Sequence, residues 1–150
     1  MTILIENRQK KIEVNLQQVQ QTLNQIMNIM ACNNKEISLI FIDDDDIRKI
    51  NRDYLGRDNP TNVIAFSLLE GEFGDINPHM LGDIVISVET ALRDARESGI
   101  SFDDEVDFLM IHGMLHLLGY NHENTPPEES EKMKNKEKDV FLQLKGYCFE

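Results

Sequence analysis

Apolar and polar residues follow two different periods along this chain, and these periods predict where strands and helices lie. Four short runs are rich in β-branched and apolar residues, which is typical of strands. These runs cover residues 2–6, 36–42, 62–69 and 81–87. Between and after them, apolar residues recur every three to four positions, which indicates helices that each bury one face.

Five helices follow from this second period and from the signals at their ends. We expect them at residues 15–31, 44–54 and 88–98, in a long stretch after Ser101, and at 128–144. Asp43 predicts an N-cap for the second of them. The acids after Asp43 suit the positive end of the helix dipole, and we favour this interpretation over a cation site. Ser101 with Asp104 resembles a capping box at the start of the long helix.

Strands interspersed with helices, and consecutive helices at the carboxyl-terminal end, favour an α+β fold with a mixed sheet of about four strands. At 150 residues, the chain is long enough for a substantial core. Residues 1–150 carry no internal repeat or low-complexity tract. We therefore expect a single domain.

Three of the four histidines lie within HGMLHLLGYNH, residues 112–122. His112 and His116 are one helical turn apart, so that both imidazoles project from one face of the long helix. Gly119 suits a left-handed residue that ends the helix and reverses the chain, which would bring His122 to the same point. Three imidazoles and a water molecule form an open catalytic zinc site. We expect one Zn²⁺ per chain at these residues.

This motif has two other interpretations. Paired histidines on an apolar helix can be core residues, but the third histidine after a helix-ending glycine favours a metal site. The spacing is that of the metzincin peptidases, which have Glu directly after the first histidine as general base. Gly113 occupies that position here. The sequence therefore keeps a metzincin-like metal-binding helix and lacks the base of a peptidase.

The charge balance bears on whether the chain can bind nucleic acid. The net charge of −12 is unfavourable for binding nucleic acid, because affinity depends on neutralising phosphates. Arg48, Lys49, Arg52 and Arg57 nevertheless cluster in one segment, and they offer a path for RNA. We expect weak RNA binding unless a partner or the ribosome assists.

Two further features bear on the cellular compartment. Cys32 and Cys148 lie at opposite ends of the chain without CxxC spacing, which favours reduced thiols in the cytoplasm. No apolar run approaches the length of a membrane span, and the first residues do not form a signal peptide.

HGMLHLLGYNH resembles HGxLHLxGYDH, the signature of the YbeY family of bacterial rRNA maturation factors. Two further blocks match in the family's order: residues 58–67 are similar to DxPTDVLSF, and residues 81–87 to LGDIVIS. The resemblance implies a zinc-dependent, single-strand-specific endoribonuclease that acts on the 3′ end of 16S rRNA. Its implied partners are rRNA and the small ribosomal subunit, with ribosomal proteins or assembly GTPases as further candidates and no membrane.

The resemblance also places candidate residues around the metal. Asp83 is implied to lie near the site, either as proton acceptor or as a carboxylate that orients a ligand histidine. Thr61 and Asn62 are implied to form the cleft wall, although turn and strand-edge hydrogen bonding explains them equally well. Glu123 and His79 are weaker candidates for proton transfer, since both fit ordinary surface positions.

Two positions depart from the family pattern. Asn121 replaces an Asp, which removes a negative charge but keeps a hydrogen-bond acceptor. Leu55 stands where the family has an RNA-facing Arg directly after a Tyr, here Tyr54. Arg57, two positions further on, is our candidate to supply that guanidinium, and a solvated loop residue is the alternative. Arg52 is a further candidate for binding substrate.

Three functions therefore compete. The leading hypothesis is the endoribonuclease of rRNA processing. A metallopeptidase-like hydrolase is the second, and Gly113 speaks against it. The third is a non-catalytic ribosome-assembly factor with a structural zinc, which would need a fourth protein ligand, usually Cys.

Overall fold

The structure is a computed structural model that describes residues 3–68, 79–121 and 125–147. Its strands are β1 (Ile3–Asn7), β2 (Glu36–Ile42), β3 (Val63–Ser67) and β4 (Met80–Ser87). Its helices are α1 (Leu16–Ile29), α2 (Asp44–Leu55), α3 (Val88–Ser98), α4 (Phe102–Leu117) and α5 (Pro127–Lys145). The predicted α+β fold with a four-stranded sheet is confirmed.

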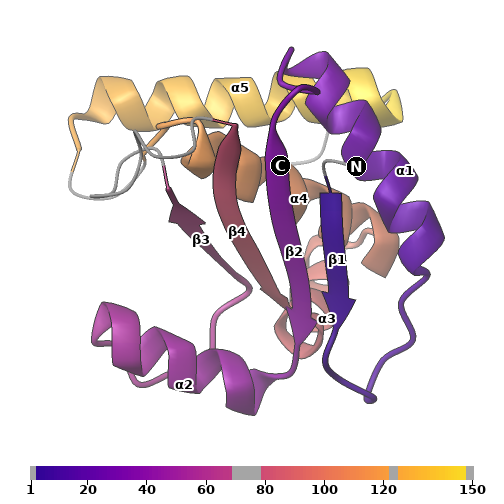
Figure 1. Ribbon diagram of the computed structural model, residues 1–150, viewed down its shortest axis with the longest axis vertical. Coiled ribbons are helices and arrows are strands. Elements are labelled where there is room, and N and C mark those ends of the chain that lie inside the picture. The colour runs from indigo at the N-terminus through magenta and orange to yellow at the C-terminus, as the bar shows by residue number, and fades with distance from the viewer. Residues whose placement is uncertain (1–2, 69–78, 122–124, 148–150) are drawn as a thin grey trace.

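The four strands form one mixed sheet in the order β1-β2-β4-β3 (Figure 1). β1, β2 and β4 run parallel, whereas β3 is antiparallel to β4 and forms an edge. Within the described residues, the strand predicted at 62–69 covers only Val63–Ser67, and position 69 lies outside the described residues.

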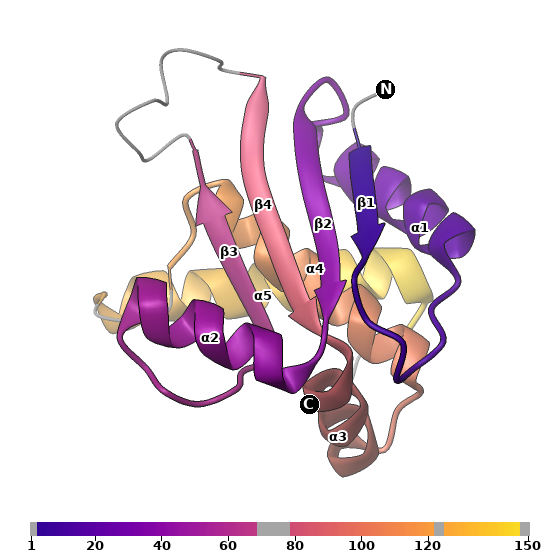
Figure 2. The same cartoon turned by 60° about the horizontal axis from the view of Figure 1, so that its bottom comes forward.

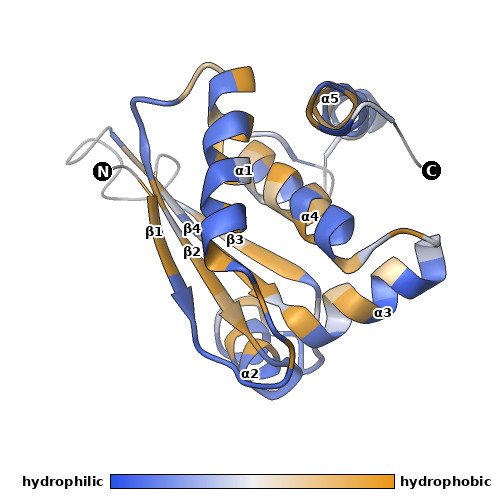
Figure 3. Cartoon of the chain, turned by 90° about the vertical axis from the view of Figure 1, so that its right-hand side faces the viewer, coloured by the Kyte–Doolittle hydropathy of each residue, from blue (hydrophilic) through white to orange (hydrophobic). Residues whose placement is uncertain are grey.

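Side chains alternate between the two faces of the sheet, and different helices cover each face. Ile84 and Ile86 of β4 belong to the main core, which also contains buried residues of α1 and α4. Val85 of β4 packs on the other face with Ile47 of α2 in a smaller cluster. Figure 2 shows α2 crossing only one end of this second face, and Figure 3 shows α1 and α4 stacked on the first.

Helix α4 is apolar over most of its surface, as expected for a helix that is buried on several sides. It lies between the sheet and α5 (Figure 3). The predicted caps form: the Ser101 side chain accepts a hydrogen bond from the backbone N–H of Asp104, and Asp43 caps α2 in the same way. None of the described helices has the length and apolarity needed to cross a membrane.

Candidate metal and substrate cleft

The two histidines of α4 meet as their spacing predicts. His112 Nε2 lies 3.2 Å from His116 Nε2, and the ring centroids are 4.7 Å apart. Two nitrogens that bind one zinc ion at about 2.0–2.1 Å with a tetrahedral angle lie about 3.3–3.4 Å apart. The observed separation therefore fits two ligands of one metal ion, and no backbone rearrangement is needed to bring them together.

The other ring nitrogen of His112 has a partner that the sequence did not reveal. His112 Nδ1 lies 2.6 Å from Oε1 of Glu137, a buried residue of α5. If Nδ1–H donates to this carboxylate, Nε2 is left with a lone pair that faces His116. A carboxylate behind a ligand imidazole is the arrangement that fixes tautomer and orientation in zinc sites.

A signal for Glu137 was present in the sequence. The buried stripe of α5 consists of Met133, Glu137, Val140 and Phe141, at helical spacing. Glu137 is the acid on this otherwise apolar stripe, and a buried acid normally has a specific partner. Its partner could not be named without knowing which helix packs against α5.

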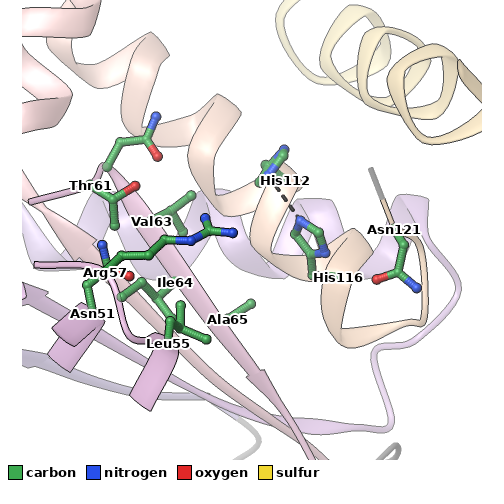
Figure 4. Close-up of a pocket in the computed structure, with 11 residues that line it drawn as sticks. Asn51, Leu55, Arg57, Thr61, Val63, Ile64, Ala65, His112, His116 and Asn121 are labelled. Atoms are coloured by element: carbon green, nitrogen blue, oxygen red, sulfur yellow. Dashed lines mark hydrogen bonds between the residues drawn. The ribbon is translucent and has the colours of Figure 1, made fainter. Parts of the chain in front are cut away.

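The predicted third ligand, His122, lies outside the described residues. Among those that are described, no set of three His, Cys, Asp or Glu side chains converges on one point. The turn before His122 forms as predicted: α4 ends at Leu117, and Gly119 has a φ of 100°. This reversal brings Asn121 to the same cleft as the two histidines (Figure 4). The third ligand stays a prediction.

Both histidines line a cleft of about 390 Å³, a volume within the range of small-ligand pockets, roughly 300–1,000 Å³. Its other walls come from the α2–β3 segment and from β3 itself. No Asp or Glu contributes to the described part of the lining, although the chain as a whole carries a charge of −12. The described lining of the cleft thus carries no negative charge, although the protein as a whole is acidic.

Arg57 reaches into this cleft from the loop after α2. Gly56 ends the helix with a φ of 72°, and the Arg57 N–H donates to Asn51 O at 3.2 Å. The Asn51 amide in turn donates to Asn59 O at 2.9 Å, which fixes the loop. In Figure 4, the Arg57 side chain extends across the cleft toward His112 and His116. Leu55, at the family's arginine position, lines the same cleft.

Thr61 and Asn62 both line the cleft, and Asn62 also has a structural part. Its side-chain amide donates to Asp94 of α3 at 2.9 Å, and its backbone oxygen accepts from Ser87 N at 3.0 Å. Both interpretations of Asn62 therefore apply at once: it forms the wall and it ties the start of β3 to α3.

Two predicted site residues lie elsewhere. Asp83 is adjacent to Ile84 in β4, and since Ile84 faces α4, Asp83 faces the opposite side of the sheet. There it lines a separate, largely apolar hollow with Tyr54 and Phe66. The expectation that Asp83 lies beside the metal ligands is therefore corrected.

Arg52 does not line the cleft either, and its guanidinium pairs with Asp53 at 3.2 Å. Arg48 is likewise engaged, at 2.8 Å from Asp58. Two members of the predicted basic cluster are thus paired with carboxylates on the surface, and Arg57 is the member that lines the cleft. His79 does not contribute to the cleft lining, and Glu123 lies outside the described residues.

Gly113, at the peptidase general-base position, packs directly against the sheet. A Cβ atom placed there would lie 2.9 Å from Cγ2 of Ile84, a fully buried residue. A glutamate side chain at this position would therefore collide with β4. The structure gives a packing reason for Gly113 that is independent of catalysis.

Comparison with known proteins gives a consistent result. The family model described as Endoribonuclease YbeY matches residues 4–145. A protein of Syntrophus aciditrophicus named Endoribonuclease YbeY is 54% identical over 98% of this chain and 92% of its own length. One of the same name from Geobacter sulfurreducens is 42% identical over 97% of each chain.

A solved structure agrees with the fold. The solution structure of TM1509 from Thermotoga maritima superposes with a TM-score of 0.66 at 28% identity. The match covers 97% of this chain and 90% of that one.

Proposed function

The chain belongs to the YbeY endoribonuclease family, and we propose that it is a zinc-dependent endoribonuclease specific for single-stranded RNA. We further propose that its substrate is precursor rRNA of the small subunit and that it matures the 16S rRNA 3′ end. The observation that carries the proposal is one cleft that combines the His112–His116 pair with Arg57 and with no described carboxylate. Such a cleft suits a polyanion.

We assign the metal to His112, His116 and His122. A zinc ion bound there would lower the pKa of a water molecule and polarise a phosphoryl oxygen. Glu137 would hold His112 in the tautomer whose Nε2 carries the lone pair that binds metal. Arg57 would bind a phosphate oxygen beside the pair, since a guanidinium forms charge-assisted hydrogen bonds with phosphate.

The two competing functions have less support. A peptidase would need a carboxylate base after His112, and the packing of Gly113 against Ile84 leaves no room for one. A closed structural zinc would need a fourth protein ligand, usually Cys. Cys32 is buried in the main core and is not part of the cleft lining, and Cys148 lies outside the described residues.

The proposal is tested by cleavage of precursor rRNA with a matched pair of arginine variants. Arg57→Ala is expected to reduce kcat/KM about tenfold, because a charge-assisted hydrogen bond contributes roughly 1.5–3 kcal/mol. Arg52→Ala should change little, since Arg52 is paired on the surface. Leu55→Arg in the Arg57→Ala protein should recover part of the loss, because Leu55 lines the same cleft.

Two results would contradict the proposal. Equal cleavage by Arg57→Ala and wild type would remove Arg57 from the substrate site. Cleavage of an unstructured protein such as casein, without cleavage of RNA, would favour the peptidase. An rRNA substrate also implies the small ribosomal subunit as partner and the cytoplasm as location, and ribosomal proteins or assembly GTPases would then supply contacts that an acidic chain lacks.

A further inference from the structure

β3 contributes Val63, Ile64 and Ala65, three consecutive residues, to the lining of the cleft. Successive side chains of a strand point to opposite faces, so that side chains alone cannot explain three consecutive lining residues. The strand must present its edge, and therefore main-chain atoms, to the cleft. β3 is an edge strand, because the described sheet ends with it.

The hydrogen-bond pattern shows which main-chain groups face outward. Ser87 N donates to Asn62 O, and Leu68 N donates to Leu81 O. In an antiparallel pair, the residues that exchange hydrogen bonds alternate along the strand. The even-numbered residues of β3 therefore bond to β4, and Val63, Ala65 and Ser67 direct N–H and C=O away from it.

Edge strands in natural proteins are usually protected by charges, prolines or bulges. β3 has the sequence VIAFS, with neither a charge nor a proline, and its pairing with β4 is regular. Within the described part of the chain, no hydrogen bond connects the outward groups of Val63 or Ala65 to another residue. An unprotected edge in the wall of the candidate cleft indicates a ligand-binding role.

We propose that the free edge of β3 binds one unpaired base of the RNA, with the N–H and C=O of Ala65 hydrogen-bonded to its Watson–Crick edge. This inference rests on the proposed function. A base offers neighbouring donors and acceptors on that edge, and single-stranded RNA is commonly bound through it. Leu55, half-exposed in the same cleft, offers apolar surface to the face of the base, and Arg57 lies where the adjacent phosphate would pass.

RNA fits this edge better than an extended polypeptide does. A peptide added as a strand would use a long row of main-chain groups, whereas only Val63 and Ala65 combine outward groups with a place in the cleft lining. The lining also has Arg57 and no described carboxylate, which favours an anionic ligand. A base in a duplex has its Watson–Crick edge occupied, and this explains in physical terms why the cleft would require single-stranded RNA.

The test compares two labelled oligonucleotides, one of uridine and one of N3-methyluridine, whose Watson–Crick edge is blocked. Binding is measured by fluorescence anisotropy and cleavage by gel electrophoresis. Wild type should bind oligouridylate about tenfold more tightly, because the methyl group removes the N3–H donor and keeps the uracil edge from approaching the strand. Ala65→Pro removes the N–H that donates to a uracil carbonyl. It should weaken binding of oligouridylate severalfold and reduce this preference, because the base is no longer held against the Ala65 C=O that accepts from N3–H.

Two matched variants separate the hydrogen bond from other effects. Ser67→Pro removes an outward N–H of the same strand outside the cleft lining, so that it should keep the preference. Ala65→Val adds bulk and keeps the N–H, so that it should keep the preference as well. Thermal unfolding confirms that each variant is folded.

Other results would each contradict a different part of the proposal. Equal affinity of wild type for both oligonucleotides, or loss of the preference in Ala65→Val, would overturn the role of the β3 edge while leaving the endoribonuclease proposal intact. Binding with the expected preference but without cleavage of any RNA would overturn the proposed function alone. Displacement of RNA by an unrelated extended peptide of equal affinity would assign the edge to a protein partner.

Discussion

Helix α5 contacts α4 at two places through ionisable side chains. Near the start of α4, Lys145 Nζ lies 2.9 Å from Asp104 and 2.6 Å from Asp107. Farther along, Glu137 lies 2.6 Å from His112 Nδ1. The two helices are antiparallel, so that a single packing arrangement places both contacts.

The two contacts differ in whether the basic side chain keeps an atom that can bind something else. The ammonium group of Lys145 is engaged by both of its partners. Although burial lowers the pKa of Lys145, hydrogen bonds to Asp107 and Asp104 raise this pKa to about 12. His112, by contrast, uses one nitrogen for Glu137 and directs the other toward His116. The first contact therefore stabilises the helix pair, whereas the second orients a group that can bind metal.

The largest effect is expected from removing the imidazole that faces His112. His116→Ala should lower zinc affinity and RNA cleavage together. The loss should exceed the roughly 10–100-fold that is typical when a residue hydrogen-bonded to a metal ligand is replaced. Zinc content is measured by atomic absorption and cleavage on precursor rRNA. Full zinc occupancy in the His112→Ala/His116→Ala double variant would refute the metal assignment.

Glu137→Gln should lower zinc affinity about tenfold, the lower end of the 10–100-fold range for residues that hydrogen-bond a metal ligand, because an amide holds the His112 Nδ1–H less strongly than a carboxylate does. Competition with a chromogenic chelator measures the affinity. Glu131→Gln, an exposed position on the same helix, is the control and should leave affinity unchanged. If both variants bind zinc like wild type, Glu137 only fills space in the helix interface.

Lys145→Met should have the opposite profile, with lower stability and unchanged zinc affinity. Loss of one partner from a buried ion pair typically costs about 3–5 kcal/mol, and partial exposure here reduces the expectation to about 2 kcal/mol. Urea unfolding at pH 8 measures the change, with the exposed Lys134→Met as control. A reduced zinc affinity in Lys145→Met would show that the two contacts are coupled along the helix.

The smallest effect is expected from Glu105, a buried acid at the same end of α4. Burial, and secondarily the charge of Asp94, raise its pKa to about 7 from an ordinary 4.5. Because the folded state favours the protonated form, its contribution to stability is complete below the ordinary pKa and is lost as pH rises through 7. Metal-free protein should therefore become less stable between pH 5 and pH 8.

Glu105→Gln should flatten this profile by on the order of 1 kcal/mol, measured as the difference in unfolding free energy between the two pH values. Every other ionisable group is present in both proteins, so that its contribution cancels in the comparison. Asp107, whose pKa burial raises to about 6, should leave a residual slope in the variant. Parallel profiles for variant and wild type would exclude Glu105 as the source.

The sequence by itself determined the features that depend on neighbours three or four residues away. The caps at Asp43 and Ser101, the pairing of His112 with His116, and the helix-ending Gly119 all follow from local geometry, and the structure has each of them. The matching motifs likewise identified the family, because the residues of each motif and their order along the chain can be recognised without knowing how the chain packs.

Tertiary structure alone decided which distant residues join the site. Glu137 meets His112 only because α5 packs antiparallel on α4, and Asp83 is excluded because the face that β4 turns toward α4 carries Ile84. Arg57 enters the cleft while Arg52 pairs with its neighbour, although the two are five positions apart. These outcomes depend on helix packing and on which face of a strand is covered, and a contact between residues far apart in the chain leaves no periodic pattern from which it could be read.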